Sequence, residues 1–248
     1  MKIIFLGTNG WYDTDTGNTT SILVDTAGAY IILDAGGGFY KIGKYIKEDK
    51  PVYLFLSHLH LDHIIGLHTL PLFSHRKGID IYIPGHDSIQ SLKAFLETPY
   101  TTPFSVLSAK TRIYNIEEIM PSGLDVALEL LYHPVPCYGY RFYVEGKTIV
   151  YCTDTGVCDN LKKLASNADI LITECALSPG ETSVLNPYHL NPENSADIAD
   201  RYGVKKLLLM HFDPGRYPRL KDRKIAERSA RAIFKNTFAA QDGYEVKL

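Results

Sequence analysis

The chain has 248 residues, 45% of them hydrophobic, and a formal net charge of −2 at pH 7. This length can bury one substantial core, so we expect a single domain over residues 1–248. The near-balanced charge excludes a general electrostatic attraction to nucleic acid, and no apolar run is long enough for a secretory signal or a membrane span. We therefore expect a cytoplasmic protein with no membrane partner. The four cysteines lack paired C-x-x-C spacing, which argues against a thiolate zinc site and a disulfide framework.

Apolar runs and their periodicity predict strands and helices along the first half of the chain. The expected strands cover residues 2–6, 20–25, 30–33, 52–56 and 79–83, and the expected helices cover residues 39–47, 64–73 and 88–96. Residues 97–108, which contain several threonines and prolines, are expected to form a loop over the functional site.

The second half of the chain repeats this scheme. The expected strands cover residues 112–116, 125–132, 140–144, 148–152, 169–173 and 205–210, and the expected helices cover residues 161–165, 193–202 and 225–234. The pattern alone predicts a mixed α/β protein and no more specific architecture.

The segment after the expected fourth strand carries four potential metal ligands within six positions: His58, His60, Asp62 and His63. His58 and His60 are two positions apart, so their side chains point to the same side of an extended segment. Asp62 and His63 then lead into the helix expected from residue 64. Imidazole and carboxylate groups suit zinc, manganese and iron, and a bound divalent ion can activate water near neutral pH. The segment therefore predicts a metal site, with one histidine pair on one ion and Asp62 with His63 on a second.

Three further residues lie where an expected strand ends and a loop begins: His133, Asp154 and His211. Such positions commonly carry functional side chains. The two carboxylate oxygens of Asp154 suit it to bridge two ions, which gives seven ligands in all. The alternatives are a helix-capping or turn role for Asp154 and an ordinary loop position for His211.

Residues 58–63 resemble the H-x-H-x-D-H signature of the metallo-β-lactamase superfamily. Residues 5–10 and 17–21 are similar to its opening strand and loop, and the Leu-Asp-Ala-Gly of residues 33–36 is similar to the end of its early hairpin. The resemblance implies an α/β fold of the αβ/βα four-layer sandwich type. It also implies two divalent ions, Zn²⁺ in the first instance, with Mn²⁺ or Fe compatible with the same ligands. Asp34 would then orient a ligating histidine; the alternative is an ordinary turn residue.

Within the superfamily, the chain is similar to the ribonuclease Z-like phosphodiesterase branch. Residues 133–141 resemble its third metal motif, and His189 lies 22 positions before His211. By this resemblance His189 binds no metal and assists the leaving group. From the ligand set itself, we expect Asp62 to orient or deprotonate the attacking water. The alternative for His189 is a capping or surface histidine at the start of a helix.

The chain departs from ribonuclease Z in one respect. Only 21 positions separate His133 from Asp154, which is enough for one hairpin and leaves no room for an RNA-gripping arm. We therefore expect a metal-dependent hydrolase of small or cyclic phosphodiesters. The alternatives are a ribonuclease Z-type processing enzyme of transfer RNA, a lactonase or thioesterase with the same metals, and a non-enzymatic metal-binding platform. A nucleic acid partner is not favoured, although a homodimer would supply RNA contacts from the partner chain.

The basic residues between positions 216 and 231 are interpreted mainly as the solvated face of a C-terminal helix. Arg216, close in sequence to His211, is a candidate to meet a small anionic substrate.

Overall fold

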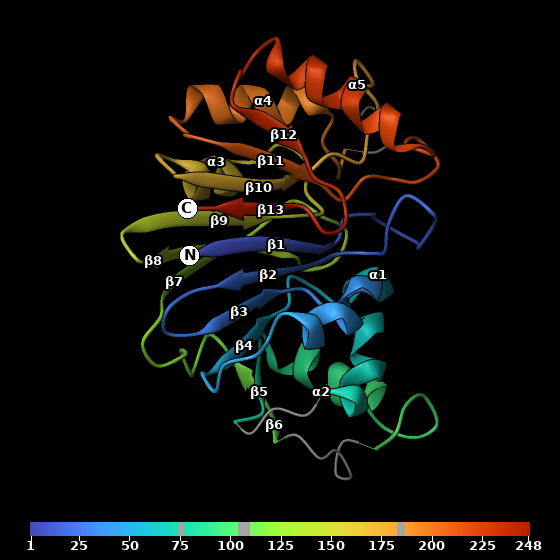
Figure 1. Cartoon of the computed structure of the whole chain (residues 1–248), viewed down its shortest axis with the longest axis vertical. Helices are drawn as coiled ribbons and strands as arrows, with labels where there is room; N and C mark the ends of the chain where they lie inside the picture. The colour runs from blue at the N-terminus through green and yellow to red at the C-terminus, as the bar shows by residue number, and fades with distance from the viewer. Residues whose placement is uncertain (74–76, 104–109, 183–186) are drawn as a thin grey trace. The chain divides into compact units, whose positions relative to one another are not determined.

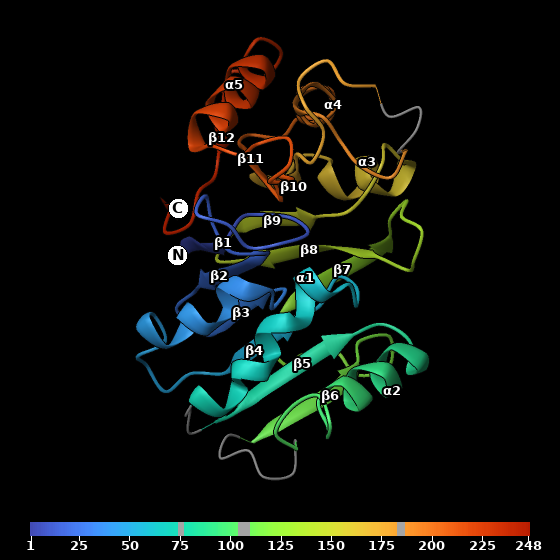
Figure 2. The same ribbon diagram turned by 90° about the vertical axis from the view of Figure 1, so that its right-hand side faces the viewer.

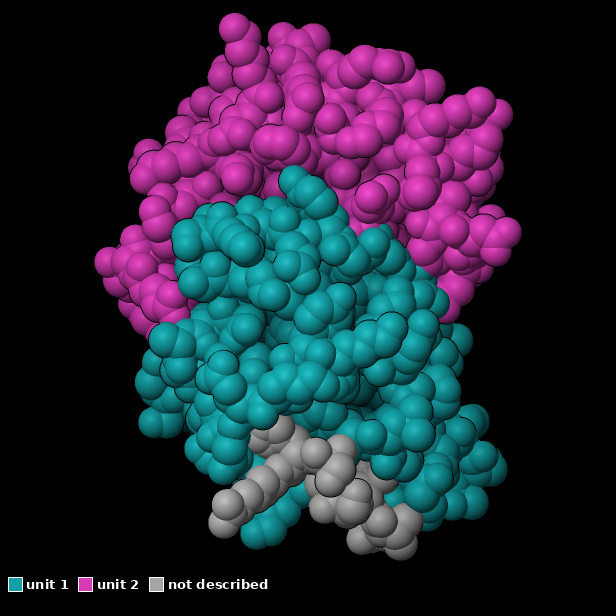
Figure 3. Space-filling model, in the orientation of Figure 1, with its two compact units in different colours: residues 1–7, 18–123, 242–248 teal, residues 8–17, 124–241 magenta. Residues whose placement is uncertain are grey.

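The structure is a computed structural model that describes residues 1–73, 77–103, 110–182 and 187–248. The chain divides into two compact units (Figure 3). The first unit comprises residues 1–7, 18–123 and 242–248, and the second comprises residues 8–17 and 124–241. Each unit has its own β-sheet and helices, so the expected mixed α/β composition is confirmed. None of the helices within the described ranges has the length and apolar character needed to cross a membrane.

The sheet of the first unit has the strand order β13-β1-β2-β3-β4-β5-β6. Its strands are β1 (Lys2–Gly7), β2 (Ser21–Asp25), β3 (Tyr30–Leu33), β4 (Val52–Phe55), β5 (Ile79–Ile83), β6 (Thr111–Asn115) and β13 (Glu245–Lys247). Pairing is antiparallel from β13 to β3 and parallel from β3 to β6. Because β3 and β4 are uninterrupted runs of buried residues, both of their faces are covered.

The helices of the first unit cover one face of its sheet, on the right in Figure 1 and in front of the strands in Figure 2. They are η1 (Gly37–Lys44), α1 (Leu61–Ile64), η2 (Ile65–Leu72) and α2 (His86–Phe95). Ile32, Leu54 and Ile81 from the strands form one cluster with Phe39 of η1 and Leu67 of η2. Burying each such side chain stabilises the fold by about 1.5–3 kcal/mol. This core holds the end of β4, from which the segment with His58 emerges.

The sheet of the second unit has the strand order β12-β11-β10-β9-β8-β7. Its strands are β7 (Asp125–Leu130), β8 (Tyr138–Val144), β9 (Lys147–Cys152), β10 (Ile170–Glu174), β11 (Leu207–Met210) and β12 (Thr237–Ala239). Pairing is antiparallel from β7 to β9 and parallel from β9 to β12. The carboxyl ends of β9, β10 and β11 therefore lie at one edge of the sheet, and the candidate residues Asp154 and His211 follow β9 and β11.

Three helices cover one face of this second sheet (Figure 1): α3 (Asp159–Ala165), α4 (Pro192–Arg201) and α5 (Leu220–Arg231). Val150 and Leu171 from the strands form one apolar cluster with Leu161, Ala196 and Ala226 from these helices. Alanine at the helix positions lets the helix backbones approach the sheet closely, because it adds no bulk beyond Cβ.

Several element boundaries differ from the expectations. The helix expected at residues 39–47 is a 3₁₀ segment, Gly37–Lys44, and α5 begins five residues earlier than residue 225. The early start is explained by Asp222, whose carboxylate accepts a hydrogen bond from the backbone N–H of Arg219 at 3.0 Å and caps the helix. Strands β12 and β13 were not expected, because each has only three residues, too few to show an alternation of apolar and polar side chains. Of the expected loop at residues 97–108, residues 104–108 lie outside the described ranges.

Candidate metal centre

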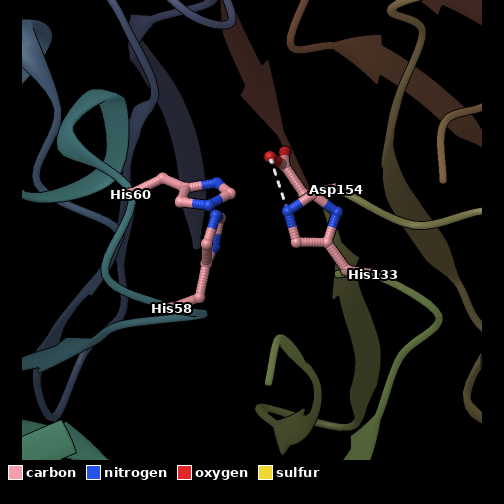
Figure 4. Close-up of side chains that lie close together, drawn as sticks. All are labelled: His58, His60, His133 and Asp154. Atoms are coloured by element: carbon pink, nitrogen blue, oxygen red, sulfur yellow. Dashed lines mark ion pairs between the residues drawn. The ribbon is translucent and has the colours of Figure 1, made fainter. Parts of the chain in front are cut away.

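The four ligands predicted in the first unit lie together. His58 follows β4, and its ring lies 4.5 Å from the ring of His60 and 4.3 Å from that of His63, measured between centroids. Figure 4 shows the rings of His58 and His60 on the segment that follows β4. The Oδ2 atom of Asp62 lies 3.4 Å from Nε2 of His63. Three imidazoles and a carboxylate at such short spacing form a set of donors that divalent metal ions prefer.

Asp34 is hydrogen-bonded to one of these ligands, His63, and to Ser57, which contacts a second, His58. Its carboxylate is fully buried and accepts hydrogen bonds from the backbone N–H of Ser57 at 2.7 Å and from the Ser57 hydroxyl at 2.8 Å. The Nδ1 atom of His63 lies 2.8 Å from the same carboxylate, so the ring donates there. Nδ1 of His58 lies 3.0 Å from the Ser57 hydroxyl, which already donates to Asp34 and therefore accepts from the ring. Both histidines thus carry their proton on Nδ1 and present the lone pair of Nε2.

Close backbone packing explains the glycine at position 36, which ends the Leu-Asp-Ala-Gly motif of residues 33–36. A Cβ atom at Gly36 would lie 2.1 Å from the carbonyl oxygen of Asp62, so only glycine fits there. The backbone N–H of Ala35 donates to the carbonyl of His63 at 2.8 Å. The end of β3 and helix α1 are therefore joined backbone to backbone. The interpretation of Asp34 as the residue that orients a histidine agrees with these contacts.

Helix α1 begins at Leu61, with His60 as its N-cap residue, and not at residue 64 as expected. Asp62 and His63 therefore belong to the first turn of the helix. An acidic side chain in that turn is favourable because the unpaired N–H groups there carry partial positive charge. Helix α1 itself has only four residues before the chain continues as η2.

The second unit brings its predicted ligands together around Asp154. Nε2 of His211 lies 2.8 Å from Oδ1 of Asp154, and Nε2 of His133 lies 3.9 Å from Oδ2 (Figure 4). The hydroxyl of Thr153 donates to Oδ1 at 2.9 Å. The two oxygens of Asp154 thus face different histidines, which is the arrangement that a bridging carboxylate needs.

Glu174, which no motif in the sequence singled out, holds His189. Its fully buried carboxylate lies 3.0 Å from Nδ1 of His189 and accepts hydrogen bonds from the backbone N–H groups of Thr155 and Leu190. The signal was a lone acidic residue at the end of the apolar run Ile170–Glu174. Burial by itself lowers the pKa of His189, but the Glu174 carboxylate, helped by Asp154, outweighs it, so the pKa lies above its ordinary value. Glu174 therefore favours the protonated imidazolium.

His189 also lies near a predicted ligand. Its ring stacks with that of His211 at a centroid distance of 6.2 Å, and Glu174, His189 and His211 each offer a ligand atom within 4.8 Å of the others. The bond to Glu174 occupies only Nδ1, so Nε2 is the atom with which His189 would act.

Arg216, the candidate to meet an anionic substrate, is paired with two carboxylates. Its guanidinium is held by the carboxylates of Glu181, at 2.7 Å, and of Asp213, at 2.5 Å, and these carboxylates raise its pKa. Two acids therefore balance its charge in the structure.

Comparison with known proteins places the chain in a family. A family model described as the beta-lactamase superfamily domain matches residues 29–212. The chain belongs to the metallo-β-lactamase superfamily. Within this superfamily it has the ribonuclease Z-like character expected from its sequence. It is accordingly a metal-dependent hydrolase, and the alternative of a non-enzymatic platform is set aside.

A ribonuclease Z from Prochlorococcus marinus subsp. pastoris is 28% identical to this chain, over 98% of each protein. Among solved structures, the metallo-β-lactamase fold protein YhfI from Bacillus subtilis is 23% identical and matches with a TM-score of 0.79, over 99% of this chain and 98% of that one. The short form of human tRNase Z is 22% identical and matches with a TM-score of 0.74, over 100% and 99%. These likenesses confirm the expected fold of this superfamily member.

Proposed function

We propose that the seven candidate ligands hold two divalent metal ions. His58, His60, His133 and Asp154 would bind one ion, and Asp62, His63, Asp154 and His211 would bind the other. The residues fit such ions, because every one offers an imidazole nitrogen or a carboxylate oxygen and because Ser57 and Asp34 fix two of the imidazoles through Nδ1. Zinc is the proposed metal, and manganese or iron suit the same donors.

The proposed chemistry assigns one task to each of two side chains. Bound divalent ions would lower the pKa of a water molecule and neutralise phosphate charge. Asp62, only 10% exposed at its side chain, would orient that water or accept its proton. His189, whose Nδ1 lies 3.0 Å from Glu174, would donate a proton from Nε2 to the departing oxygen.

The proposed substrates are small or cyclic phosphodiesters, and the observation that carries this proposal is the short hairpin between His133 and Asp154. Strands β8 and β9 fill that interval and turn at Glu145 and Gly146, whose φ values of 52° and 71° are typical of a two-residue turn. An RNA-gripping arm has no place there. The ribonuclease Z relative aligns over 311 positions, whereas this chain has 248 residues, so that relative has additional segments.

The second candidate function is processing of transfer RNA precursors, which the relative named ribonuclease Z favours. This function requires RNA contacts from elsewhere, and a homodimer would provide them. Hydrolysis of a lactone or thioester with the same metals is a third outcome that the experiment below separates.

The test is a hydrolysis screen with metal-loaded protein at physiological salt. Its substrates are bis(p-nitrophenyl) phosphate, a 2′,3′-cyclic nucleotide, a transfer RNA precursor, a lactone and a thioester. We expect kcat/KM to be highest for the phosphodiesters of low molecular mass. Efficient 3′ cleavage of the RNA would instead establish the ribonuclease Z function, and activity on the lactone or thioester alone would overturn the phosphodiesterase proposal.

A further inference from the structure

The segment of residues 8–17 displays two aromatic side chains to solvent. Trp11, the only tryptophan of the chain, is 73% exposed, and Tyr12 is 43% exposed. Their ring centroids lie 5.3 Å apart with an angle of 74° between the ring planes, so the tyrosine supports the indole edge to face. Trp11 has a φ of 65°, a left-handed conformation that a bulky residue rarely adopts. Such strain persists only where the surrounding structure imposes it, and it is concentrated at functional sites.

Buried polar contacts hold this segment in place. The side-chain amide of Asn9 donates to the carbonyl oxygens of Tyr12 at 3.2 Å and of Gly17 at 2.8 Å. Arg223, which is buried in α5, donates to the hydroxyl of Thr8 at 2.7 Å and to the side-chain oxygen of Asn9. The backbone that carries the two exposed rings is therefore held by hydrogen bonds within the second unit. Fixed aromatic side chains bind with little loss of conformational entropy.

The same segment lies against a predicted metal ligand. A Cβ atom at Gly10 would lie 2.4 Å from the imidazole of His211, so glycine is required there and the backbone rests on the ring. The backbone N–H of Gly10 also donates to the carbonyl of Phe212 at 3.0 Å. The Cα atom of Trp11 is one peptide unit, about 3.8 Å, from that of Gly10. The backbone of Trp11 therefore directly follows the residue that contacts the His211 ring.

The area of this aromatic pair bears on whether a protein or a small molecule would bind to it. Two aromatic side chains bury at most about 500 Å², whereas a stable protein interface requires roughly 800 Å² on each partner. A planar base can stack on one face of an indole. The pair thus fits a small molecule with one aromatic group.

We propose that Trp11, supported by Tyr12, is a stacking subsite for a planar aromatic group, namely the nucleobase of a nucleotide whose phosphate binds beside His211. The subsite rests on the proposed phosphodiesterase function and names its substrate class as nucleotide phosphodiesters. Stacking on an indole accepts any base, because every base has a π-face. The subsite therefore selects for the presence of a base and not for its identity.

The single tryptophan allows a direct test that does not depend on turnover. The metal-loaded protein is titrated with adenosine 5′-monophosphate and, in parallel, with ribose 5-phosphate, which lacks only the base. We expect the first to change the tryptophan fluorescence saturably and the second to leave it unchanged. Equal responses, or no response to either, would overturn the subsite.

Calorimetric titration of variants completes the test. Trp11→Gly removes the ring and adopts the left-handed conformation without strain, so the segment should keep its fold. Its affinity for adenosine 5′-monophosphate should fall about 5- to 150-fold, the range for loss of one base–aromatic contact, with its affinity for ribose 5-phosphate unchanged. Trp11→Phe should retain most of the affinity. Tyr143→Leu, at an exposed tyrosine of β8, is the control and should bind as the wild type does.

The outcomes separate this inference from the function on which it rests. Discrimination between the two ligands without phosphodiester hydrolysis would leave the subsite in place and contradict the proposed reaction. Hydrolysis of phosphodiesters by a Trp11→Gly protein with unchanged nucleotide affinity would contradict the subsite alone.

Discussion

At the scale of single residues, left-handed backbone conformations occur where β-strands end. Asp34, Asp154 and His211 have φ values of 56°, 45° and 52°, and each stands one or two positions after a strand. Aspartate and histidine adopt this conformation more readily than most residues, yet each instance costs of the order of 1–3 kcal/mol. All three side chains take part in the hydrogen-bonded or ion-paired clusters described above. The strain is therefore concentrated at the candidate metal centre.

Replacing Asp34 tests whether it positions the ligands of the first unit. Asp34→Ala removes the acceptor for Nδ1 of His63 and for Ser57, so the imidazoles lose their fixed orientation. We expect metal affinity to fall about 10- to 100-fold, the usual effect of losing such a partner. Competition with a chromogenic chelator measures it. Asp49→Ala, at an exposed position of the same unit, should bind metal normally.

Replacing Asp154 tests the bridging role. Asp154→Ala should weaken both metal sites, because one carboxylate serves both proposed ligand sets. Elemental analysis of the purified variant should show less than one ion per chain, against close to two in the wild type. Asp159→Ala, whose side chain is 94% exposed, is the matched control. Full metal content in the Asp154 variant would reject the bridge.

Replacing His189 tests the leaving-group role. His189→Ala should keep its metal and lose about 10²- to 10⁴-fold in kcat, the range for acid–base assistance. Glu174→Gln should show a smaller loss of the same kind, because Glu174 would act on the leaving group only through its contact with His189. Both losses should shrink with a p-nitrophenolate leaving group, which departs without a proton. Loss of metal from the His189 variant would make this residue a ligand instead.

At the scale of elements, helix α5 does more than present a solvated basic face. Arg223 is only 2% exposed, lies over the ring of Phe212 at 4.7 Å and reaches residues 8 and 9, near the start of the chain. The expectation of a solvated basic face is therefore wrong at Arg223. The guanidinium can be buried because oxygen acceptors and an aromatic ring surround it.

The contribution of Arg223 to stability is measurable. Arg223→Ala takes a charged donor away from buried Thr8 and Asn9, so we expect the free energy of unfolding to fall by about 1–3 kcal/mol. Urea denaturation measures the change. Arg228→Ala, at an exposed position of the same helix, should stay within about 0.5 kcal/mol of the wild type. Equal effects of the two substitutions would contradict an anchoring role.

At the scale of the whole molecule, charge and chain length bear on the choice between RNA and small substrates. The net charge is −2, and the hairpin of β8 and β9 leaves no room for an added arm. Phosphate contacts dominate nucleic-acid affinity and make it fall with salt. We therefore expect weak binding of transfer RNA, with a logarithmic salt dependence of slope shallower than about −2, or fewer than about three neutralised phosphates. Fluorescence anisotropy over a salt series measures it, and a steep slope would favour the ribonuclease Z function.

The sequence alone indicated the family, the positions of most strands along the chain and the ligand motif. These features are local: a buried strand is a run of apolar residues, and a ligand at its end follows within a few positions. The short strands β12 and β13 have no such local signature, since their pairing partners, and not their own three residues, make them strands.

Only the tertiary structure decided which partners the buried charged residues have. Asp34 reaches His63 across 29 positions, Glu174 reaches His189 across 15, and Arg223 reaches Thr8 across 215. A buried charge is tolerable only with partners that remove its desolvation cost, and these partners come from other elements of the fold. No periodicity in the sequence records that pairing, because it depends on which strand ends and loops the folded chain brings side by side.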